Sequence, residues 1–121
     1  TQADEGILGM KATAATSVAD IALTAHSSEQ GWQSSDLLSF NGQKVRLRTM
    51  NAVEARWHRH LNSDELFIVL TGRLEVDLRA ADDTISTHTL LPNQMLAVHA
   101  GSEHRARSAG LTTLLVLDVI E

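Results

Sequence analysis

From residue 41 onward, apolar and polar side chains alternate along the chain in the manner of β-strands. The dipeptide Asn41-Gly42 is a strong signal for a hairpin turn. In the residues that follow, Val45, Leu47 and Thr49 alternate with basic side chains. A period of two with one charged face predicts a half-buried strand over this stretch.

The same pattern, interrupted by turn residues, recurs down to the end of the chain. Polar loops are expected at 61–64, 80–83 and 100–103, and a turn at Pro92-Asn93. Short strands at regular spacing predict an all-β sandwich or barrel of roughly seven or eight strands, with no convincing helix after residue 40. The strands are expected at 53–60, 65–71, 73–79, 85–91, 95–99 and 111–120.

The N-terminal part of the chain reads differently, because it is rich in Ala, Ser and Thr and lacks this alternation. A short helix is expected over Ser17–Ala25. The segment could cap one end of the barrel, cross to a partner subunit, or lie loosely on the surface. A chain of 121 residues indicates one domain, with an N-terminal extension over 1–40 and a β-barrel over 41–121.

Composition excludes several classes of protein. The net charge is −5 and there are two Trp and two Phe but no Tyr, so we expect neither nucleic acid nor a membrane as partner. The longest apolar runs are too short to span a bilayer, and the acidic N-terminus does not resemble a secretory signal. We therefore expect a soluble, cytoplasmic protein. Because the chain has no cysteine, nitrogen and oxygen ligands would hold any metal.

Two of the six histidines are candidates for such ligands. His58 and His60 are two residues apart, so on a strand over 53–60 their side chains would project from the same face. That arrangement suits two imidazoles on one cation. Pairs of this kind also arise by chance, and two solvated surface histidines would give the same pattern.

Glu65 strengthens the case for a metal. The loop over 61–64 would fold the next strand back, which places Glu65 near the paired histidines at the head of an apolar strand. A carboxylate buried there needs a partner, because an unpaired buried charge is costly. The partner could be a cation shared with the imidazoles, or a salt bridge to Arg56 or Arg59.

These residues resemble the motifs of the cupin superfamily. The stretch HAGSEH at 99–104 is similar to the end of the second cupin motif, Pro-x-Gly-x-x-His, with His99 in the place of proline. The resemblance covers about residues 41–120 and is especially marked for small single-domain cupins related to the mannose-6-phosphate isomerase barrels. The spacing of the first cupin motif is kept by His58, His60, Glu65 and Gly72.

The resemblance implies a jelly-roll barrel with one divalent metal ion inside, held by three histidines and one carboxylate. Zinc, manganese, iron, nickel or cobalt could occupy a site of this kind. One or two coordination positions would stay open to water or substrate. Transferred residue by residue, the implied ligands are His58, His60, Glu65 and His104.

The sequence departs from the cupin motifs outside these ligand positions. Ala52 stands where the first motif opens with Gly, and Ser108 where the second closes with Asn. Asn93-Gln94 replaces a turn made of Gly and an acidic residue, although asparagine also tolerates left-handed backbone. His99 is expected to be a strand-end side chain. These departures weaken the assignment to a subfamily of cupins, but they leave the four implied metal ligands unchanged.

Side chains beside the implied metal indicate a pocket for a small polar molecule. By strand parity, Arg56 shares the face of the paired histidines, where it could bind a carboxylate or phosphate. It could equally lie in solvent or pair with Glu54. Phe67 shares the parity of Glu65 and would line the pocket with apolar surface.

Two classes of function remain open at this stage. The first is a metal-dependent enzyme with isomerase or dioxygenase chemistry, for which the sequence names no general base. The second is a non-catalytic protein that binds a sugar or carboxylate, and a metal that only stabilises the barrel is a third possibility. The cupin resemblance also implies a homodimer, paired through barrel strands and the N-terminal segment.

Overall fold

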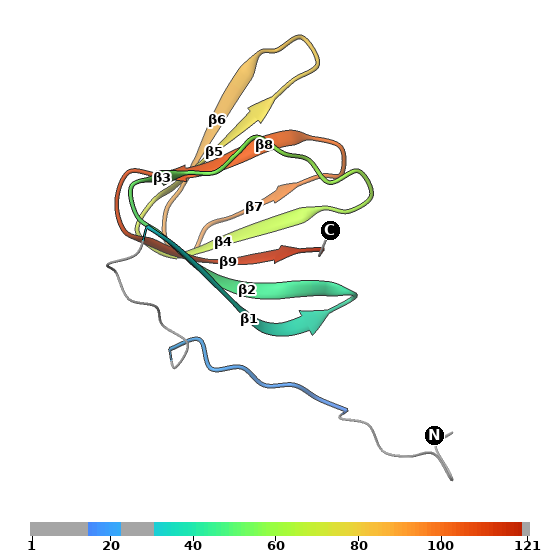
Figure 1. Cartoon of the computed structure of the whole chain (residues 1–121), viewed down its shortest axis with the longest axis vertical. Coiled ribbons are helices and arrows are strands. Elements are labelled where there is room, and N and C mark those ends of the chain that lie inside the picture. The colour runs from blue at the N-terminus through green and yellow to red at the C-terminus, as the bar shows by residue number, and fades with distance from the viewer. Residues whose placement is uncertain (1–14, 23–30, 120–121) are drawn as a thin grey trace.

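The computed structural model describes residues 15–22 and 31–119. Within these residues there are nine β-strands and no α-helix, so the all-β prediction is confirmed (Figure 1). The strands are β1 (Trp32–Phe40), β2 (Gln43–Met50), β3 (Val53–Glu54), β4 (Glu65–Thr71), β5 (Leu74–Arg79), β6 (Ile85–Leu90), β7 (Met95–Val98), β8 (Glu103–Ser108) and β9 (Thr112–Asp118).

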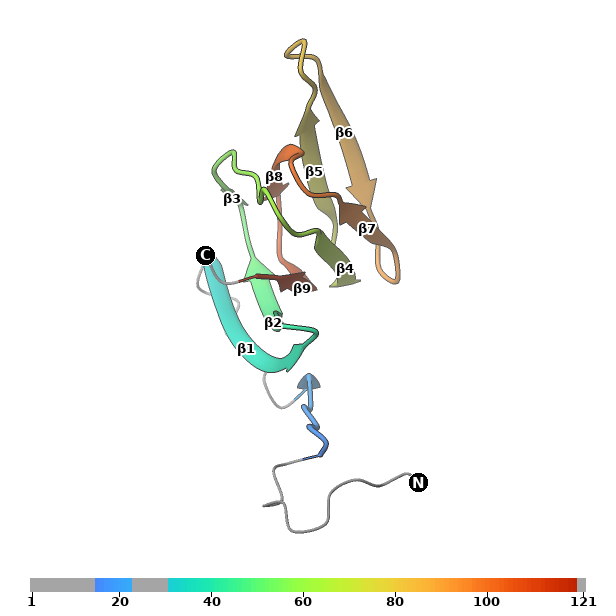
Figure 2. The ribbon, with the colours of Figure 1, turned by 90° about the vertical axis from the view of Figure 1, so that its right-hand side faces the viewer.

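The strands form two antiparallel sheets that face each other across the core, as Figures 1 and 2 show from two directions. The five-stranded sheet has the order β1-β2-β9-β4-β7, and the four-stranded sheet has the order β3-β8-β5-β6. The chain passes repeatedly from one sheet to the other, for example between β4 and β5. This topology is that of a jelly roll, which confirms the predicted fold.

Two strands are absent from the sequence prediction. The large apolar residues of β1 do not alternate with polar ones, and β8 has no large apolar residue. β1 lies at the edge of its sheet, where many of its side chains are exposed and polar residues are tolerated. β8 lies between two neighbours, but it carries His104, Ala106 and Ser108 on its buried face and charged residues on the other. The strands of the barrel therefore begin at Trp32 and not at residue 41.

The expected strand over 53–60 is mostly irregular. Only Val53 and Glu54 pair as a strand, with β8 as their neighbour. Further along, His58 forms an isolated β-bridge with His104. The chain therefore runs beside β8 without continuous pairing, and a simple alternation of sides does not apply to this segment.

The helix expected over Ser17–Ala25 is not formed by the residues described there. Residues 15–20 have no regular secondary structure, Ile21 lies in a turn and Ala22 in a 3₁₀ turn, while 23–25 lie outside the described residues. None of the described residues belongs to a helix long and apolar enough to cross a membrane.

The hydrophobic core lies between the two sheets. Alternate residues of β4 and β9 point inward and meet the inner faces of β5 and β8, as expected for the pleat of facing sheets. The buried apolar residues of this core are Met50, Phe67, Val69, Leu74, Val76, Leu90, Val98, Ala106, Leu114 and Val116. The polar groups of the candidate site lie at one end of this core.

Candidate metal centre

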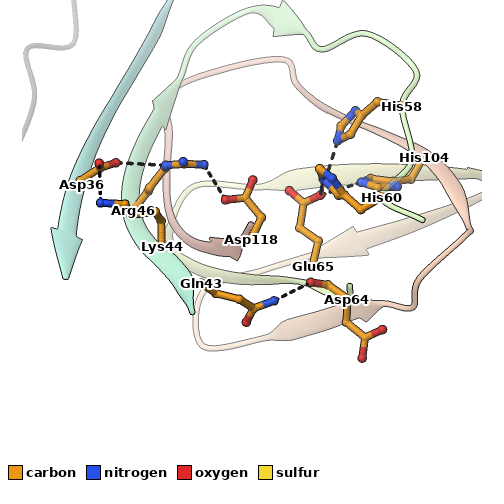
Figure 3. Close-up of polar contacts among 10 residues, drawn as sticks. All are labelled: Asp36, Gln43, Lys44, Arg46, His58, His60, Asp64, Glu65, His104 and Asp118. Atoms are coloured by element: carbon orange, nitrogen blue, oxygen red, sulfur yellow. Dashed lines mark hydrogen bonds and ion pairs between the residues drawn. The ribbon is translucent and has the colours of Figure 1, made fainter. Parts of the chain in front are cut away.

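The predicted ligands come together from both sheets, and backbone hydrogen bonds join two of them. The His58 N–H donates to the His104 carbonyl (3.0 Å), and the His104 N–H donates to the His58 carbonyl (2.9 Å). His60 follows in the same segment, and Glu65 is the first residue of β4 in the opposite sheet. We call these four residues, which Figure 3 shows converging, the His/Glu cluster: His58, His60, Glu65 and His104.

One carboxylate oxygen is the centre of this cluster. Glu65 Oε1 lies 3.4 Å from His58 Nε2, 3.1 Å from His60 Nε2 and 2.8 Å from His104 Nε2. The four candidate ligand atoms all lie within 4.8 Å of one another. Glu65 and His104 are buried, whereas His58 and His60 are half-buried and form the side nearer to solvent.

Backbone carbonyls fix two of the imidazole rings. His58 Nδ1 lies 3.0 Å from the Arg56 carbonyl, and His104 Nδ1 lies 2.9 Å from the Ser102 carbonyl. Because a carbonyl only accepts hydrogen bonds, Nδ1 carries the proton in both rings. Nε2 of a neutral ring is then an acceptor, and so is the Glu65 carboxylate. Protons on Nε2 or a metal cation must therefore separate these atoms.

The charges of the cluster respond to this arrangement. Burial is the largest single influence on Glu65 and favours its neutral form, but hydrogen bonds with His104 and His58 outweigh it and lower its pKa to about 2. The hydrogen bond with Glu65 raises the pKa of His58 above its ordinary value. Both shifts favour a carboxylate paired with imidazolium, an arrangement in which a divalent cation can replace the protons.

Comparison with known proteins identifies the family. The family model described as Cupin domain matches residues 42–120. The chain belongs to the cupin family. Among related proteins, YdbB of Bacillus subtilis, an uncharacterized protein, is 38% identical over 78 residues, which is 64% of this cupin and 65% of YdbB. The chain thus spans less than two thirds of that relative.

Solved structures show the same fold. A cupin-2 domain-containing protein from Shewanella frigidimarina matches 76% of this cupin and 84% of its own chain, with a TM-score of 0.65 and 24% identity. A cupin superfamily protein from Desulfitobacterium hafniense matches 86% of this cupin and 90% of its own chain, with a TM-score of 0.68 and 17% identity. Similarity at these identities supports the fold and leaves the reaction open.

The donor set of this cupin suits a divalent transition metal. Three imidazole nitrogens and one carboxylate oxygen can coordinate zinc, manganese, iron, nickel or cobalt. The carbonyls of Arg56 and Ser102 hold two of the rings with Nε2 facing Glu65. Hydrogen bonds of this kind orient metal ligands in proteins generally. The residues of the cluster therefore fit the metal that the fold implies.

The two residues predicted to bind substrate lie in different surroundings. The Arg56 side chain is exposed, because the strand parity that predicted an inward position does not hold in this irregular segment. Arg56 contacts the cluster only through its carbonyl, which lies next to His58 Nδ1. The partners of Glu65 are the histidines and not Arg56 or Arg59. Phe67 is buried in the core, with its ring centroid 6.1 Å from that of His104.

His99 is a strand-end side chain, as the sequence predicts. It follows β7, its side chain is exposed, and its Nδ1 lies 3.3 Å from an oxygen of Asp64. The Asp64 carboxylate also accepts a hydrogen bond from the Ala100 N–H at 2.9 Å. Asp64 therefore fastens the loop after β7 and points away from the neighbouring Glu65 carboxylate, as Figure 3 shows.

Asp118 is a buried charged residue that the sequence reasoning did not identify. It ends β9, and the pairing of Leu66 with Leu117 places it beside Glu65 on the inner face of the sheet. Burial raises its pKa, and the negative charge of Glu65 acts in the same direction. Its position could have been found from the alternation of β9, because Asp118 has the same parity as the core residues Leu114 and Val116.

Proposed function

We propose that this cupin binds one divalent metal ion through the His/Glu cluster and acts on a small polar metabolite inside the barrel. The observation that carries the proposal is the conflict of acceptors around Glu65 Oε1. With Nδ1 of His58 and His104 bonded to carbonyls, the Nε2 lone pairs of the neutral rings would face a carboxylate oxygen at 3.4 Å and 2.8 Å unless protons or a cation lie between them. One cation between Glu65 Oε1 and the two Nε2 atoms would accept a lone pair from each of them.

A bound metal would supply Lewis-acid chemistry, for isomerisation through an enolate or for reaction of a substrate with dioxygen. The protein residues would hold and orient the reacting molecule. Phe67 closes the apolar side next to His104, and the half-buried His58 and His60 form the side by which a ligand can approach. This combination of apolar walls and a few polar groups is typical of small-molecule sites.

Non-catalytic binding of a sugar or carboxylate is the second candidate, and the surroundings of Asp118 favour it. Asp118 is the carboxyl next to Glu65 on the inner face, and its Oδ1 is in an ion pair with Arg46 Nη1 at 2.5 Å. Burial raises the pKa of Asp118, but its Oδ1 is occupied by the guanidinium of Arg46 and is not free to accept a proton from a substrate. The described residues around the cluster therefore include no general base with both carboxylate oxygens free.

The metal content of the purified protein tests the proposed site. We expect near one equivalent by elemental mass spectrometry in the parent and none in the His58→Ala/His60→Ala double variant. The matched control is His88→Ala/His99→Ala, because both of these histidines are exposed and lie outside the cluster. A parent that stays empty after incubation with manganese, iron, cobalt, nickel and zinc would refute the proposal.

Turnover separates the two candidate functions. The metal-loaded protein would be screened with small hydroxy acids, keto acids and sugars, both for product and for a ligand-induced rise of the melting temperature. Product formation that the double variant lacks supports the enzyme. A thermal shift without product supports the binding protein.

We also propose that two copies pair through the outer face of the five-stranded sheet. This face is apolar because the residues between the inward-pointing ones of β2, β4 and β9 are aliphatic. They form two rows that cross the three strands, according to the strand register. The rows are Val45–Leu117–Leu66 and Leu47–Leu115–Ile68. Leu47 is already buried within one copy, and the other five residues are half-buried and would make the contact.

A further inference from the structure

The basic face of β2 is turned into the barrel. Arg46 pairs with Val116 of β9, and Arg48 pairs with Leu114, both of which are completely buried core residues. Directly paired residues of antiparallel strands project to the same side of the sheet. Two guanidinium groups therefore project from the same inner face as Glu65.

Arg46 is paired with two carboxylates. Its Nε donates to Asp36 Oδ1 at 3.0 Å, and its Nη1 bonds to Asp118 Oδ1 (Figure 3). Lys44 is also paired with Asp36, at 3.4 Å. The negative charges of Asp36 and Asp118 thus balance the positive charge of Arg46, and the two contacts hold its side chain between β1 and β9.

Arg48 is in a different situation. Its guanidinium carbon lies 4.4 Å from the ring centroid of Trp32 on the edge strand β1. Its Nε is buried and has no hydrogen-bond partner among the described residues. Burial lowers the pKa of Arg48, and the charges of Glu65 and Asp118 oppose that effect. An arginine side chain remains protonated in proteins, so Arg48 is a cation that interacts with the charge of Glu65, and its Nε is a donor without a partner among the described residues.

We propose that Arg48 binds the carboxylate of a small organic acid whose other end reaches the metal at the His/Glu cluster. This inference rests on the proposed function and names its substrate class. Trp32 is 41% exposed, so the Arg48–Trp32 pair borders solvent and a ligand can reach it. The sequence placed this role on Arg56, which lies outside, whereas the strand register assigns it to Arg48.

A carboxylate suits this place better than a phosphate. One guanidinium can hold one carboxylate through two parallel hydrogen bonds. A phosphate dianion carries more charge than one carboxylate group, and the buried carboxylates of Glu65 and Asp118 would repel it. Arg48 would be its main cationic partner in the protein, since Arg46 is already paired. An acid with a second oxygen group a few atoms away could contact the metal at the same time.

Titration with malonate tests the proposal, because malonate carries two carboxylates on one carbon. In a Trp57→Phe background Trp32 is the remaining tryptophan, so its fluorescence reports on the Arg48 environment. We expect saturable binding of malonate to the metal-loaded protein, with a dissociation constant at least tenfold higher for Arg48→Gln. Inorganic phosphate at the same ionic strength should bind more weakly than malonate.

A matched control is available on the outer face of the other sheet. In the parent, Arg79 lies 4.3 Å above the ring of Trp57, which is the same kind of contact as that of Arg48 with Trp32. In the Trp57→Phe background an aromatic ring stays at this position. Arg79→Gln should leave malonate binding unchanged. If Arg48→Gln lacks a cooperative thermal transition, Arg48→Lys carries the test, because it keeps the charge but loses the planar pair of donors. It should weaken binding several-fold.

The outcomes separate this inference from the proposed function when metal content is measured on the same samples. Metal-loaded protein that binds no malonate, or binds it equally well after either substitution of Arg48, overturns the role of Arg48 while the metal site stands. Tighter binding of phosphate overturns the assignment to carboxylates. Malonate binding that depends on Arg48 in a protein unable to load metal supports the role of Arg48 and refutes the metal site.

Discussion

Glu65 is the residue on which the proposed metal site most depends, since its Oε1 is the atom that all three Nε2 atoms face. Glu65→Gln keeps the shape of the side chain but removes the charge. We expect metal affinity to fall by more than the roughly 10–100-fold that follows loss of a group supporting a ligand. Competition with a chromophoric chelator measures this.

The matched control for Glu65 is Glu103, the neighbour of His104 in sequence. Its side chain points to the outer face, where it lies 3.8 Å from Arg79. Glu103→Gln should bind metal as the parent does. Equal affinities of all three proteins would remove Glu65 from the ligand set.

Ala52 illustrates a departure from the cupin motif that has a measurable cost. It stands where the motif opens with Gly, and its φ is 53°, in the left-handed region. This conformation costs a residue other than glycine roughly 1–2 kcal/mol, as judged from left-handed helices. Asn93, at the other departure from glycine, has φ 71°, which asparagine tolerates better.

Ala52→Gly should therefore stabilise the protein. Relief of the strained backbone is partly offset by the greater freedom of glycine in the unfolded chain, about 0.5–1 kcal/mol, so we expect a net gain of up to about 1 kcal/mol. Denaturant unfolding with an unchanged m-value measures it. Gly42→Ala, at φ 75° with no atom within 4 Å of the added Cβ, should change stability in the opposite direction. A loss of stability in Ala52→Gly would contradict this interpretation.

At the scale of the elements, the sequence predicts the strands that carry alternating apolar residues and fails where charge replaces them. The prediction of β4 at 65–71 is confirmed without a shift, because its apolar run is bounded by a polar loop and Gly72. β8 is missed because it has no large apolar residues, and the contacts of its outer face are ion pairs with Asp77 of β5. Arg105 and Arg107 each donate to Asp77 through Nε at 2.9 Å. Periodicity of apolar residues cannot reveal such pairs.

The same limit applies to the site. The resemblance to the cupin motifs implied all four members of the His/Glu cluster, which the structure brings together. It could not show that β2 turns Arg48 inward, because alternation defines two faces without saying which one meets the core. It could not place Arg56 either, because the parity of a strand fails where the strand is interrupted.

Asp77 should make the joint between β5 and β8 sensitive to acid. Its hydrogen bond with Arg107 is the main cause that lowers its pKa below the usual value. Because the pKa is lowered on folding, the stabilisation is present above the unfolded pKa of about 3.9 and is lost as pH falls through the folded value. We expect Asp77→Asn to cost about 1–3 kcal/mol at neutral pH, the cost of breaking a buried hydrogen-bonded group.

Chemical denaturation between neutral pH and pH 2 measures this effect. The loss of stability on acidification should be shallower in Asp77→Asn than in the parent. Asp82→Asn is a suitable control, because Asp82 is exposed in the turn after β5 and its bonds are to Thr84. Parallel acid profiles of parent and Asp77→Asn would contradict the assignment.

For the whole molecule, metal should reverse the effect of pH on stability. In metal-free protein, pairing with Glu65 raises the pKa of His58 above its unfolded value of about 6.5. The pairing therefore stabilises the folded state fully below that pH, and this stabilisation is lost as pH rises through the folded pKa. Glu65, with a pKa of about 2, stays charged throughout. Metal binding requires deprotonated imidazoles and so strengthens with pH.

The gain in melting temperature on metal loading should therefore be larger at pH 8 than at pH 6. Scanning calorimetry of chelator-treated and reloaded protein measures it. The His58→Ala/His60→Ala variant serves as the control and should gain nothing at either pH. A gain that is equal at both pH values would show that protons and metal do not compete at this cluster.

The proposed dimer pairs through the outer face of the five-stranded sheet. Leu115 lies at its middle, because the register pairs it with Leu47 on one side and Ile68 on the other. Burial of this face between two copies would stabilise a dimer at roughly 25 cal/mol for each Å² of apolar surface removed from water. Leu115→Glu should abolish the dimer and leave the fold intact, since Leu115 points away from the core between the sheets.

Light scattering after size exclusion measures the assembly at micromolar concentration. We expect twice the chain mass of 13.2 kDa for the parent and 13.2 kDa for Leu115→Glu. Ile85→Glu is the control, because Ile85 is an exposed apolar residue, 49% accessible, on β6 of the other sheet, and it should remain dimeric. If the parent is a monomer, the proposed pairing through the apolar rows of β2, β9 and β4 is wrong. If both variants stay dimeric, pairing uses a surface other than this face.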